Sequence, residues 1–462
     1  MQIVLSHGYF LEEDSKEQKI MRPYPPLGLL YISAYLQSNG ISNKVFDTTF
    51  SSYQAWKDFL ITNSPNVIGL YSNLMTKIRI VQMIKWIRKN LPHAKVVIGG
   101  PDTTYNIHRY LRSGAHFVVL GEGEITMFEL SKALLKLETK DLQNVKGIAW
   151  LDANGTLCKS PGRSKIKDLD SLPVPNREGI NLNLYLDSWR MHHGYASISV
   201  STQRGCPYTC KWCSTAVYGQ SYRRRSGKSV VNELKSLIDT YEVNRFWFVD
   251  DVFSISHKWL DTFEEELQRQ SVTIQFECIT RADRLNEDII RQLKKMGCFR
   301  IWIGAESGSQ KVIDLMDRRV NVQHVSEMIR STRAHGVEAG TFIMLGYPGE
   351  TEGDILQTVE YLRKSNPNHF TITIAYPING TAMHREVVRE ERPQTQWEEE
   401  TDREISFERA YSRNYYDHAV RYVVHAVECG KYPPWVHYRW WWHLSISFLA
   451  RIGMQWEKTR LT

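Results

Sequence analysis

The segment Cys206-Pro207-Tyr208-Thr209-Cys210-Lys211-Trp212-Cys213 places three cysteines in a CxxxCxxC pattern within eight residues. Three thiolates on one short loop are suited to three irons of a [4Fe–4S] cluster, because thiolates are the soft ligands that such clusters take. The fourth iron has no cysteine ligand in this loop, which leaves the open position that a catalytic metal site needs. That position suits a chelating ligand, such as the amino and carboxylate groups of a methionine-type molecule.

Two other interpretations of these cysteines are open on spacing alone. A zinc site usually adds a second CxxC or a His pair, but the next cysteine along the chain, Cys278, stands alone. Three unrelated buried thiols are the other alternative. The chain has seven cysteines, and an odd number without a signal-peptide pattern argues against a disulfide scaffold. The remaining four are expected to be core or surface thiols: Cys158, Cys278, Cys298 and Cys429.

Strand-like runs alternate with helical patterns on both sides of the cysteine loop. From residue 196 onward, six short apolar runs predict an open or partial β/α barrel, in which polar residues after the strands carry the chemistry. These runs begin ASISV (196–200), RFWFV (245–249), TIQFECIT (273–280), FRIWIGAE (299–306), EAGTFIML (338–345) and HFTITI (369–374).

The first 150 residues show the same alternation, which predicts a parallel sheet with helices on both faces. Ligands bind such sheets at the carboxyl ends of the strands. The residues expected to line a crevice there are Tyr71, Ser72, Asn73, Gly99, Gly100, Pro101, Gly121, Glu122, Gly123 and Glu124. Small residues at these positions would let a large flat ligand approach the backbone.

The predicted organisation has four parts. Residues 1–150 form a Rossmann-like α/β domain, 151–195 a small hairpin and linker, 196–385 the barrel, and 386–462 a mainly helical, aromatic C-terminal domain or lid. Trp435 and Trp440–Trp442 could stack on a substrate or lie at a membrane interface, and packing over the barrel mouth is the favoured interpretation. Arg223-Arg224-Arg225 is expected to be a solvated surface run.

The cysteine loop and the segments after the later strands resemble the radical S-adenosylmethionine (SAM) superfamily. The segments that carry the resemblance, in order, are Arg204–Cys213, Phe248–Phe253, Thr280–Asp283, Gly304–Ser309 and Gly346–Thr351. The resemblance implies that a reduced [4Fe–4S] cluster, held by Cys206, Cys210 and Cys213, cleaves SAM to methionine and a 5′-deoxyadenosyl radical.

SAM needs polar partners beside the cluster, and the motif positions supply candidates. Arg281 suits the SAM carboxylate, because a guanidinium pairs well with a carboxylate. Asp251 and Glu306 suit its amino or ribose hydroxyl groups. Asp250 is a weaker candidate, because one of two adjacent side chains in a strand points away. Tyr208 and Trp212 are expected to shield the cluster from water.

The N-terminal half resembles the cobalamin-binding domains that are fused to radical SAM barrels. Pro25-Pro26-Leu27-Gly28, Ser72–Leu74, Val97–Pro101 and Gly121–Glu124 carry this resemblance. The Asp-x-His-x-x-Gly motif that supplies a cobalt ligand is absent from this sequence, and His7 is followed directly by Gly8. We therefore expect cobalamin to bind without a histidine ligand on its lower face, and His7 to be an ordinary strand-end residue.

The resemblance implies a cobalamin-dependent radical SAM enzyme, most often a C-methyltransferase that methylates an unactivated carbon of a small molecule or natural product through methylcobalamin. A cyclisation or rearrangement without methyl transfer is the first alternative, and a non-catalytic cluster- or cobalamin-binding protein is the second. The implied partners are the substrate and an electron donor such as flavodoxin or ferredoxin.

Composition agrees with a globular cytoplasmic protein. Lys plus Arg exceeds Asp plus Glu by 58 to 51, and a net charge of +7 over 462 residues is too mild to predict nucleic-acid binding. The sequence shows no signal-peptide pattern and no run of about 18 apolar residues that would predict a transmembrane segment.

Overall fold

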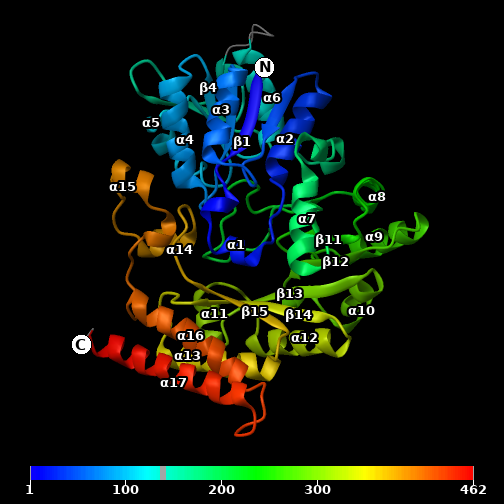
Figure 1. Ribbon diagram of the computed structural model, residues 1–462, viewed down its shortest axis with the longest axis vertical. Coiled ribbons are helices and arrows are strands. Elements are labelled where there is room, and N and C mark those ends of the chain that lie inside the picture. The colour runs from blue at the N-terminus through cyan, green and yellow to red at the C-terminus, as the bar shows by residue number, and fades with distance from the viewer. Residues whose placement is uncertain (1, 136–141, 461–462) are drawn as a thin grey trace. The chain divides into compact units, whose positions relative to one another are not determined.

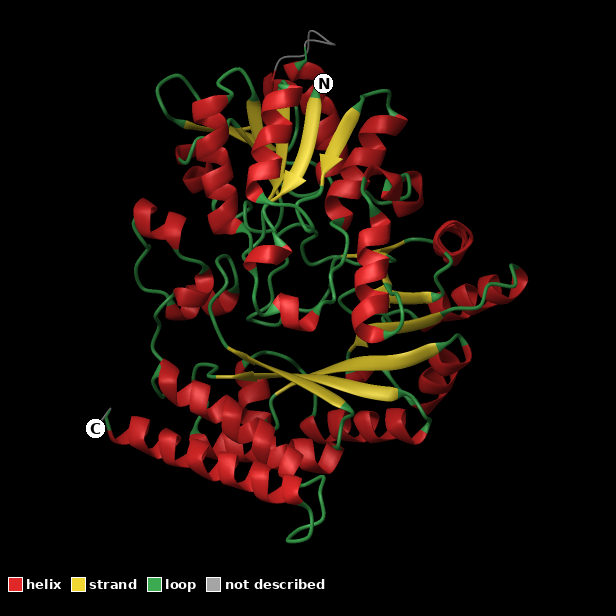
Figure 2. Cartoon of the chain, viewed as in Figure 1, coloured by secondary structure: helices red, strands yellow, loops and turns green. Residues whose placement is uncertain are grey.

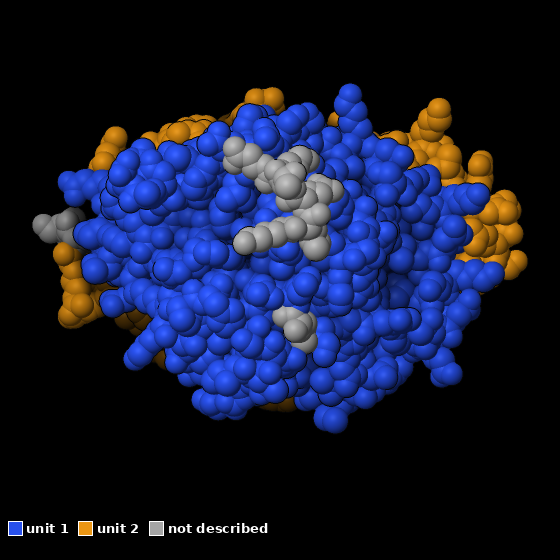
Figure 3. All heavy atoms as spheres, turned by 90° about the horizontal axis from the view of Figure 1, so that it is seen from above, with its two compact units in different colours: residues 1–207, 214–247, 390–404 blue, residues 208–213, 248–389, 405–462 orange. Residues whose placement is uncertain are grey.

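The computed structural model describes residues 2–135 and 142–460 (Figure 1), whose helices and strands are distinguished in Figure 2. The chain divides into two compact units, coloured separately in Figure 3. The first unit comprises Met1–Pro207, Ser214–Trp247 and Glu390–Glu404, and the second comprises Tyr208–Cys213, Phe248–Arg389 and Ile405–Thr462. Each unit is described by itself.

A seven-stranded sheet forms the centre of the first unit, in the order β2-β1-β3-β4-β5-β6-β7. Strands β1 to β5 pair in parallel, as the alternating pattern predicts. The last two strands are antiparallel, so the expected hairpin extends this sheet. The strands are β1 (Ile3–His7), β2 (Asn43–Phe46), β3 (Val67–Tyr71), β4 (Lys95–Gly99), β5 (Phe117–Val119), β6 (Ile148–Leu151) and β7 (Leu157–Lys159).

Helices cover both faces of this sheet, because strands buried on two sides alternate their apolar side chains between two cores. Val4 and Ile68 point into the core under α3 (Tyr53–Asn63), α4 (Lys77–Asn90) and α5 (Ile107–Arg112). Ile3 and Val67, one residue earlier in each strand, point into the core under α2 (Leu27–Ser38) and α6 (Gly123–Leu134). The doubly wound α/β fold expected for residues 1–150 is confirmed.

Residues 390–404 return to this first unit. Trp397, on α15 (Gln394–Glu399), is fully buried in the core beside α4 and meets Tyr110 edge to face with ring centroids 4.9 Å apart. The ammonium group of Lys77 donates a hydrogen bond of 2.6 Å to the Trp397 carbonyl and lies 4.6 Å from its ring centroid. The expected C-terminal region 386–462 is thus divided between the two units.

The six strands expected from residue 196 onward form a second sheet, in the order β15-β14-β13-β12-β11-β8. The pairs β12–β13, β13–β14 and β14–β15 are parallel, as a β/α barrel requires. The strands are β8 (Ile198–Val200), β11 (Arg245–Phe248), β12 (Gln275–Thr280), β13 (Cys298–Glu306), β14 (Glu338–Leu345) and β15 (His369–Ile374), and the helices between them are α8 (Gly227–Tyr241), α9 (His257–Arg269), α10 (Glu287–Lys295), α11 (Gln310–Leu315), α12 (Val322–Ala334) and α13 (Glu352–Ser365).

Two helices, α16 (Arg413–Cys429) and α17 (Tyr438–Thr459), end the chain in the second unit. Helix α17 packs on α16, which packs on α13 (Figure 1). Trp435 is 70% exposed and Trp442 is 63% exposed. The expectation that the aromatic tail packs over the barrel mouth is therefore wrong, because α17 buries Ser447, Ala450, Met454 and Glu457 and leaves Trp441 and Trp442 exposed. Among the residues described, no helix is both long and apolar enough to cross a membrane.

A buried arginine precedes the cysteine loop in the first unit. Arg204 lies on β9 (Gln203–Arg204), which pairs antiparallel with β10 (Arg223–Arg224). Its guanidinium donates hydrogen bonds to Glu122 Oε1 at 2.8 Å and Glu124 Oε1 at 2.5 Å. Arg223 donates to the other oxygen of Glu122 at 2.7 Å. Arg225 is buried against Glu233, so the expectation of a solvated Arg223–Arg225 run is wrong.

Substitution of Glu124 by alanine should destabilise the first unit. The change leaves Arg204 buried with one carboxylate fewer, and removing one partner of a buried ion pair costs about 3–5 kcal/mol. Urea denaturation of the purified protein measures this loss. As a control, Asp187→Ala removes the exposed partner of Arg190 and should change the free energy of unfolding by about 1 kcal/mol at most. Equal stabilities of the two variants would contradict the prediction.

Glu350 closes the turn between β14 and α13 in the second unit. Its carboxylate is fully buried and accepts a hydrogen bond of 2.5 Å from the backbone N–H of Gly346, which has a φ of +79°. Burial raises the pKa of Glu350 to about 8, and the nearby charge of Asp354 adds to the increase. The carboxyl group is therefore held in its neutral form below that pH.

Stability should fall as pH rises from about 5 to 8, because the unfolded chain releases the Glu350 proton at its ordinary pKa and the folded chain retains it. The slope from this group is at most about 1.4 kcal/mol per pH unit. Glu350→Gln should remove that slope in urea denaturation measured across the interval. Glu360→Gln, an exposed change on the helix that follows, α13, should keep it. An unchanged slope in Glu350→Gln would refute this account.

Candidate functional site

Two guanidinium groups lie against the central cysteine of the loop in the second unit. Arg281 Nη1 lies 3.8 Å from Cys210 Sγ, and Arg318 Nη1 lies 3.7 Å from the same sulfur. Arg281 is 2% exposed and follows β12, while Arg318 lies in the turn after α11. A thiolate bound to iron carries negative charge, so two cations at this distance offset it where water is scarce.

The aromatic residues of the loop contact the same two arginines. The guanidinium carbon of Arg281 lies 3.8 Å from the Tyr208 ring centroid, and that of Arg318 lies 5.6 Å from the Trp212 ring centroid. Arg284 Nε also donates a hydrogen bond of 2.5 Å to the Tyr208 hydroxyl. These cation–π contacts fix the loop around Cys210. They give Tyr208 and Trp212 a positioning role that the expectation of water shielding did not include.

Glu306, predicted to contact SAM, ends β13 beside Arg318. One carboxylate oxygen lies 3.6 Å from Arg318 Nη2, and burial raises the pKa of Glu306, although both arginines oppose that shift. Its φ of +68° is uncommon for a residue other than glycine. Such backbone strain persists only where the surroundings enforce it, and it gathers at functional sites.

Arg318 was not predicted from the sequence. It follows no strand directly and lies in none of the segments that resemble the radical SAM superfamily, so nothing in the neighbouring sequence predicts its role. The one related feature of the sequence is the glycine at position 304, which leaves space for the Arg318 side chain. A Cβ atom at Gly304 would lie 2.3 Å from Arg318 Nη2, so a side chain there would displace the guanidinium. Arg318 Nη2 instead donates a hydrogen bond of 3.0 Å to the Gly304 carbonyl.

The two adjacent aspartates among the SAM candidates point to opposite sides, as the strand geometry predicts. Asp250 is buried and Asp251 is exposed, as alternation along an extended chain requires. Partial desolvation of the Asp251 carboxyl group and the neighbouring charge of Asp250 raise the pKa of Asp251. The Arg281 guanidinium donates hydrogen bonds to Asp283, at 2.8 Å, and to the Arg318 carbonyl, at 3.0 Å, in addition to its contact with Cys210. Contact of these side chains with SAM stays a prediction.

The three loop cysteines are unbridged thiols, of which Cys213 is exposed. By residue, Cys206 belongs to the first unit, and Cys210 and Cys213 belong to the second. Within residues 2–135 and 142–460, no three His, Cys, Asp or Glu side chains form a group that could hold a metal ion. Ligation of a cluster by these three cysteines therefore stays a prediction. The surroundings of Cys210 fit such a cluster, because a soft sulfur donor lies beside two buried cations.

A separate cavity of about 330 Å³ lies in the first unit. It is at the carboxyl ends of β1 and β3, where ligands bind doubly wound sheets. Its wall includes the resembling segment Pro25-Pro26-Leu27-Gly28, together with His7, Tyr71 and Asn73. His7 is buried, and its Nε2 lies 2.9 Å from Asp47 Oδ1. This contact agrees with the expected strand-end role of His7.

Two polar residues predicted to line the crevice have internal partners. Ser72 is buried and its hydroxyl is 2.7 Å from that of Tyr110, and Glu122 binds Arg204 and Arg223. A Cβ atom at Gly100 would lie 2.2 Å from the Ser72 carbonyl oxygen, so the close approach of two strand ends requires this glycine. Of the predicted cobalamin contacts, Asn73 lines the cavity, and the others are elsewhere: Ser72, Leu74, Gly99, Gly100, Pro101, Gly121, Glu122 and Gly123.

Comparison with known proteins agrees with this two-part arrangement. Residues 200–362 match the radical SAM superfamily and residues 19–131 match the B12 binding domain. An uncharacterised methyltransferase of Pyrococcus horikoshii is 27% identical over 78% of this chain and 77% of its own length. The anaerobic magnesium-protoporphyrin IX monomethyl ester cyclase of Rubrivivax gelatinosus is 24% identical over 75% of this chain and 63% of its own length.

A solved structure has the same fold over most of the chain. The radical SAM methyltransferase TsrM of Kitasatospora setae, with cobalamin and a [4Fe–4S] cluster bound, superimposes with a TM-score of 0.68. The match covers 84% of this chain and 78% of TsrM, at 17% identity. The fold and the two domain matches together define a radical SAM enzyme.

Residues 19–131 are a B12 binding domain and residues 200–362 a radical SAM domain. The cofactors of these two domains are a [4Fe–4S] cluster, SAM and cobalamin. The resemblance drawn from the cysteine loop and the strand-end segments is confirmed.

Arg318→Met should weaken both the cluster and its chemistry. The change removes a charged hydrogen bond to Cys210, and such bonds are worth about 1.5–3 kcal/mol. We expect lower iron content after anaerobic reconstitution and SAM cleavage slowed roughly tenfold or more. Iron analysis and quantification of 5′-deoxyadenosine measure the two effects. Arg319→Met, an exposed neighbour paired with Asp317, serves as the control and should match the wild type. The same result from both variants would exclude a role for Arg318.

Proposed function

We propose that this protein is a cobalamin-dependent radical SAM methyltransferase that methylates an unactivated carbon of a small molecule or natural product. The observation that carries the proposal is the pair of guanidinium groups on Cys210, in a chain whose other domain matches the B12 binding family. The relative from P. horikoshii is named a methyltransferase, and so is TsrM, which superimposes over most of this chain.

In this proposal Cys206, Cys210 and Cys213 each bind one iron. When bound, the cluster and SAM supply a hydrogen-abstracting radical, and cobalamin supplies the methyl group. Arg281 and Arg318 offset the negative charge on the Cys210 sulfur, and Tyr208 and Trp212 keep that sulfur dry. Glu306 and Asp251 offer carboxyl oxygens to the amino and hydroxyl groups of SAM.

The first unit would bind the corrin beside its cavity. Asn73 stands at the end of β3, where its side-chain oxygen accepts hydrogen bonds of 3.0 Å from the Met75 and Thr76 backbone N–H groups. Asn73 lines the cavity together with the apolar segment Pro25–Leu27. An apolar wall with few polar groups is typical of a cofactor site. His7 is already bonded to Asp47 and is assigned no bond to cobalt.

One observation favours a second candidate function. The relative from R. gelatinosus is named a cyclase, and this chain spans 63% of its length. A cyclisation or rearrangement would use the same cofactors without methyl transfer. The mass of the product separates the two reactions, because methylation adds one methylene unit and rearrangement adds none.

The decisive assay uses anaerobic, iron-reconstituted protein supplied with cobalamin, reductant and SAM labelled in its methyl group. We expect a bound corrin spectrum, formation of 5′-deoxyadenosine and transfer of label to an added substrate. Cys210→Ala should abolish deoxyadenosine formation, because the cluster loses a ligand. Cys158→Ala is the matched control, since this half-buried thiol lies on β7 outside the loop.

Three results would count against the methyltransferase proposal. Deoxyadenosine without bound corrin would mean that the first unit does not use cobalamin. A labelled SAM pool with an unlabelled, rearranged product would favour the cyclase-like reaction. Failure of the reduced protein to cleave SAM would favour a non-catalytic cluster-binding role.

A further inference from the structure

Helix α17 packs on α16 through a face that buries none of its tryptophan side chains. Ser447, Ala450 and Met454 are buried against α16. The two helices approach so closely that a Cβ atom at Gly453 would lie 2.5 Å from His418 Nδ1. The face of α17 that contacts α16 therefore leaves no space for larger side chains.

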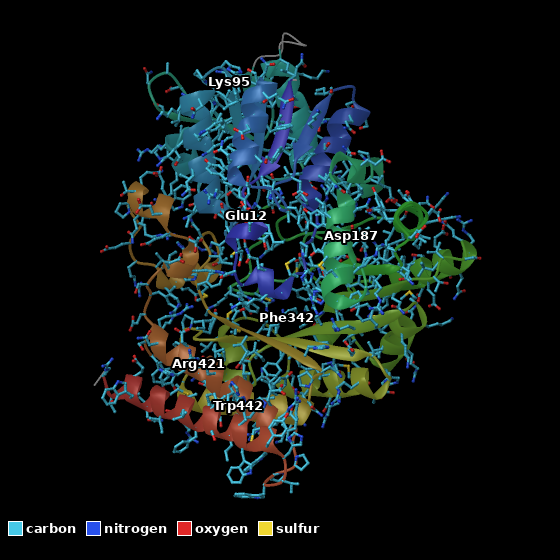
Figure 4. All side chains as sticks on the ribbon, in the orientation of Figure 1. Glu12, Lys95, Asp187, Phe342, Arg421 and Trp442 are labelled. Carbon is cyan, nitrogen blue, oxygen red and sulfur yellow. The ribbon has the colours of Figure 1, made fainter. Side chains whose placement is uncertain are left out.

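The opposite face of α17 carries the large apolar side chains. They recur at helical spacing, and Phe448 and Leu449 are 63% and 65% exposed. The exposed members of this outer face are Tyr438, Trp441, Trp442, Phe448, Leu449, Ile452 and Trp456. Figure 4 labels Trp442 on this helix. A helix usually turns its large apolar side chains toward the core, so an exposed apolar row about 27 Å long marks an interaction surface.

The segment that carries this outer face has a positive charge of its own. Residues 431–460 contain five basic residues and one acidic residue, a net charge of +4. The acidic residue, Glu457, is buried and accepts a hydrogen bond of 2.8 Å from the Ser412 hydroxyl. Arg439 donates to the hydroxyl groups of Tyr432 and Tyr438, and Arg451 is exposed and lies 6.0 Å from the Tyr422 ring centroid. Lys431 and Lys458 pair with Glu428 and Glu352, respectively.

A recess opens at the N-terminal end of the outer face. It has a volume of about 320 Å³ and is lined by Tyr432, Tyr438, Arg439, Trp442 and His443. The rings of Tyr432 and His443 stack with centroids 5.7 Å apart and planes inclined by 9°. Aromatic walls with one guanidinium suit a phosphate group attached to an apolar body.

We propose that α17 docks in the plane of an anionic phospholipid bilayer, with its outer face toward the acyl chains and the phosphate groups beside Arg439 and Arg451. Trp and Tyr side chains concentrate at the membrane–water interface, and an amphipathic helix with basic residues at its edges lies in that plane. The described helices cannot cross a membrane, so the contact is one of surface docking.

Charge distinguishes a bilayer from a second copy of this chain. A symmetric dimer would place the same surface on both partners and bring two positively charged faces together. An anionic bilayer instead complements them. The observations therefore favour the lipid surface, and a dimer becomes one of the outcomes of the test.

The test is sedimentation of the full chain with vesicles of phosphatidylglycerol and phosphatidylcholine, beside vesicles of phosphatidylcholine alone. We expect binding to the anionic vesicles and at least tenfold weaker binding to the neutral ones. The variant F448Q/L449Q/I452Q should lose binding, because it removes the centre of the outer face. The variant R439Q/R451Q should bind the anionic vesicles roughly tenfold more weakly.

Matched controls carry the same type of change on exposed apolar side chains of the first unit. Met191, on α7 (Leu182–His193), is 79% exposed and Ile61, on α3, is 57% exposed. M191Q and I61Q should bind as the wild type does. Brominated lipids provide a second measurement on the unaltered protein, because they should quench tryptophan fluorescence if the α17 indoles enter the interface.

Several outcomes would overturn the proposal. These are equal binding to neutral and anionic vesicles, no quenching by brominated lipids, or binding that survives F448Q/L449Q/I452Q. Dimerisation in analytical ultracentrifugation that is lost in the same variant, without vesicle binding, would assign the outer face to a second copy. Vesicle binding needs no turnover, so its result is independent of the methyltransferase assay.

Discussion

Burial of the Arg204 charge is the constraint on which the first unit's connection to the cysteine loop depends. A guanidinium that is 5% exposed needs carboxylates at hydrogen-bond distance, and Glu122 and Glu124 supply them from the start of α6. Cys206 follows Arg204 by two residues. The pairing therefore holds the backbone just before Cys206 within the first unit, and it gives the Gly121–Glu124 segment a structural role.

The same electrostatic logic operates around Cys210 in the second unit, with the signs reversed. Here the cations are the supporting groups, and Arg281 and Arg318 each hold a loop aromatic as well as the sulfur. A guanidinium suits this double task because it is planar, carries several donors and stacks on rings. A lysine would supply the positive charge but not the planar group that stacks on a ring and donates several hydrogen bonds. The site is thus built from side chains that position the loop and tune its charge together.

Much of the fold could be predicted from the sequence, because parallel strands buried on both sides are continuous apolar runs that stand out from polar connections. All six barrel strands and the doubly wound sheet follow from that pattern. Contacts between residues far apart in the sequence could not be predicted from the pattern of apolar runs. Trp397 joins the first unit although it follows the barrel, and Arg318 reaches Cys210 from a turn without a local signal. The prediction for the aromatic tail is wrong because α17 packs on α16 through Ser447, Ala450, Met454 and Glu457 and not through its tryptophans.

Glycine at position 304 has a consequence for how this family of sequences can change. The space beside its Cα atom is occupied by the Arg318 guanidinium, so a larger residue at 304 would require the end of the Arg318 side chain to shift. A shorter residue at 318 would in turn open a void beside the glycine. We therefore expect the effect of a substitution at either position to depend on the residue at the other. Residues 304 and 318, 14 positions apart in the chain, are therefore expected to change together in evolution.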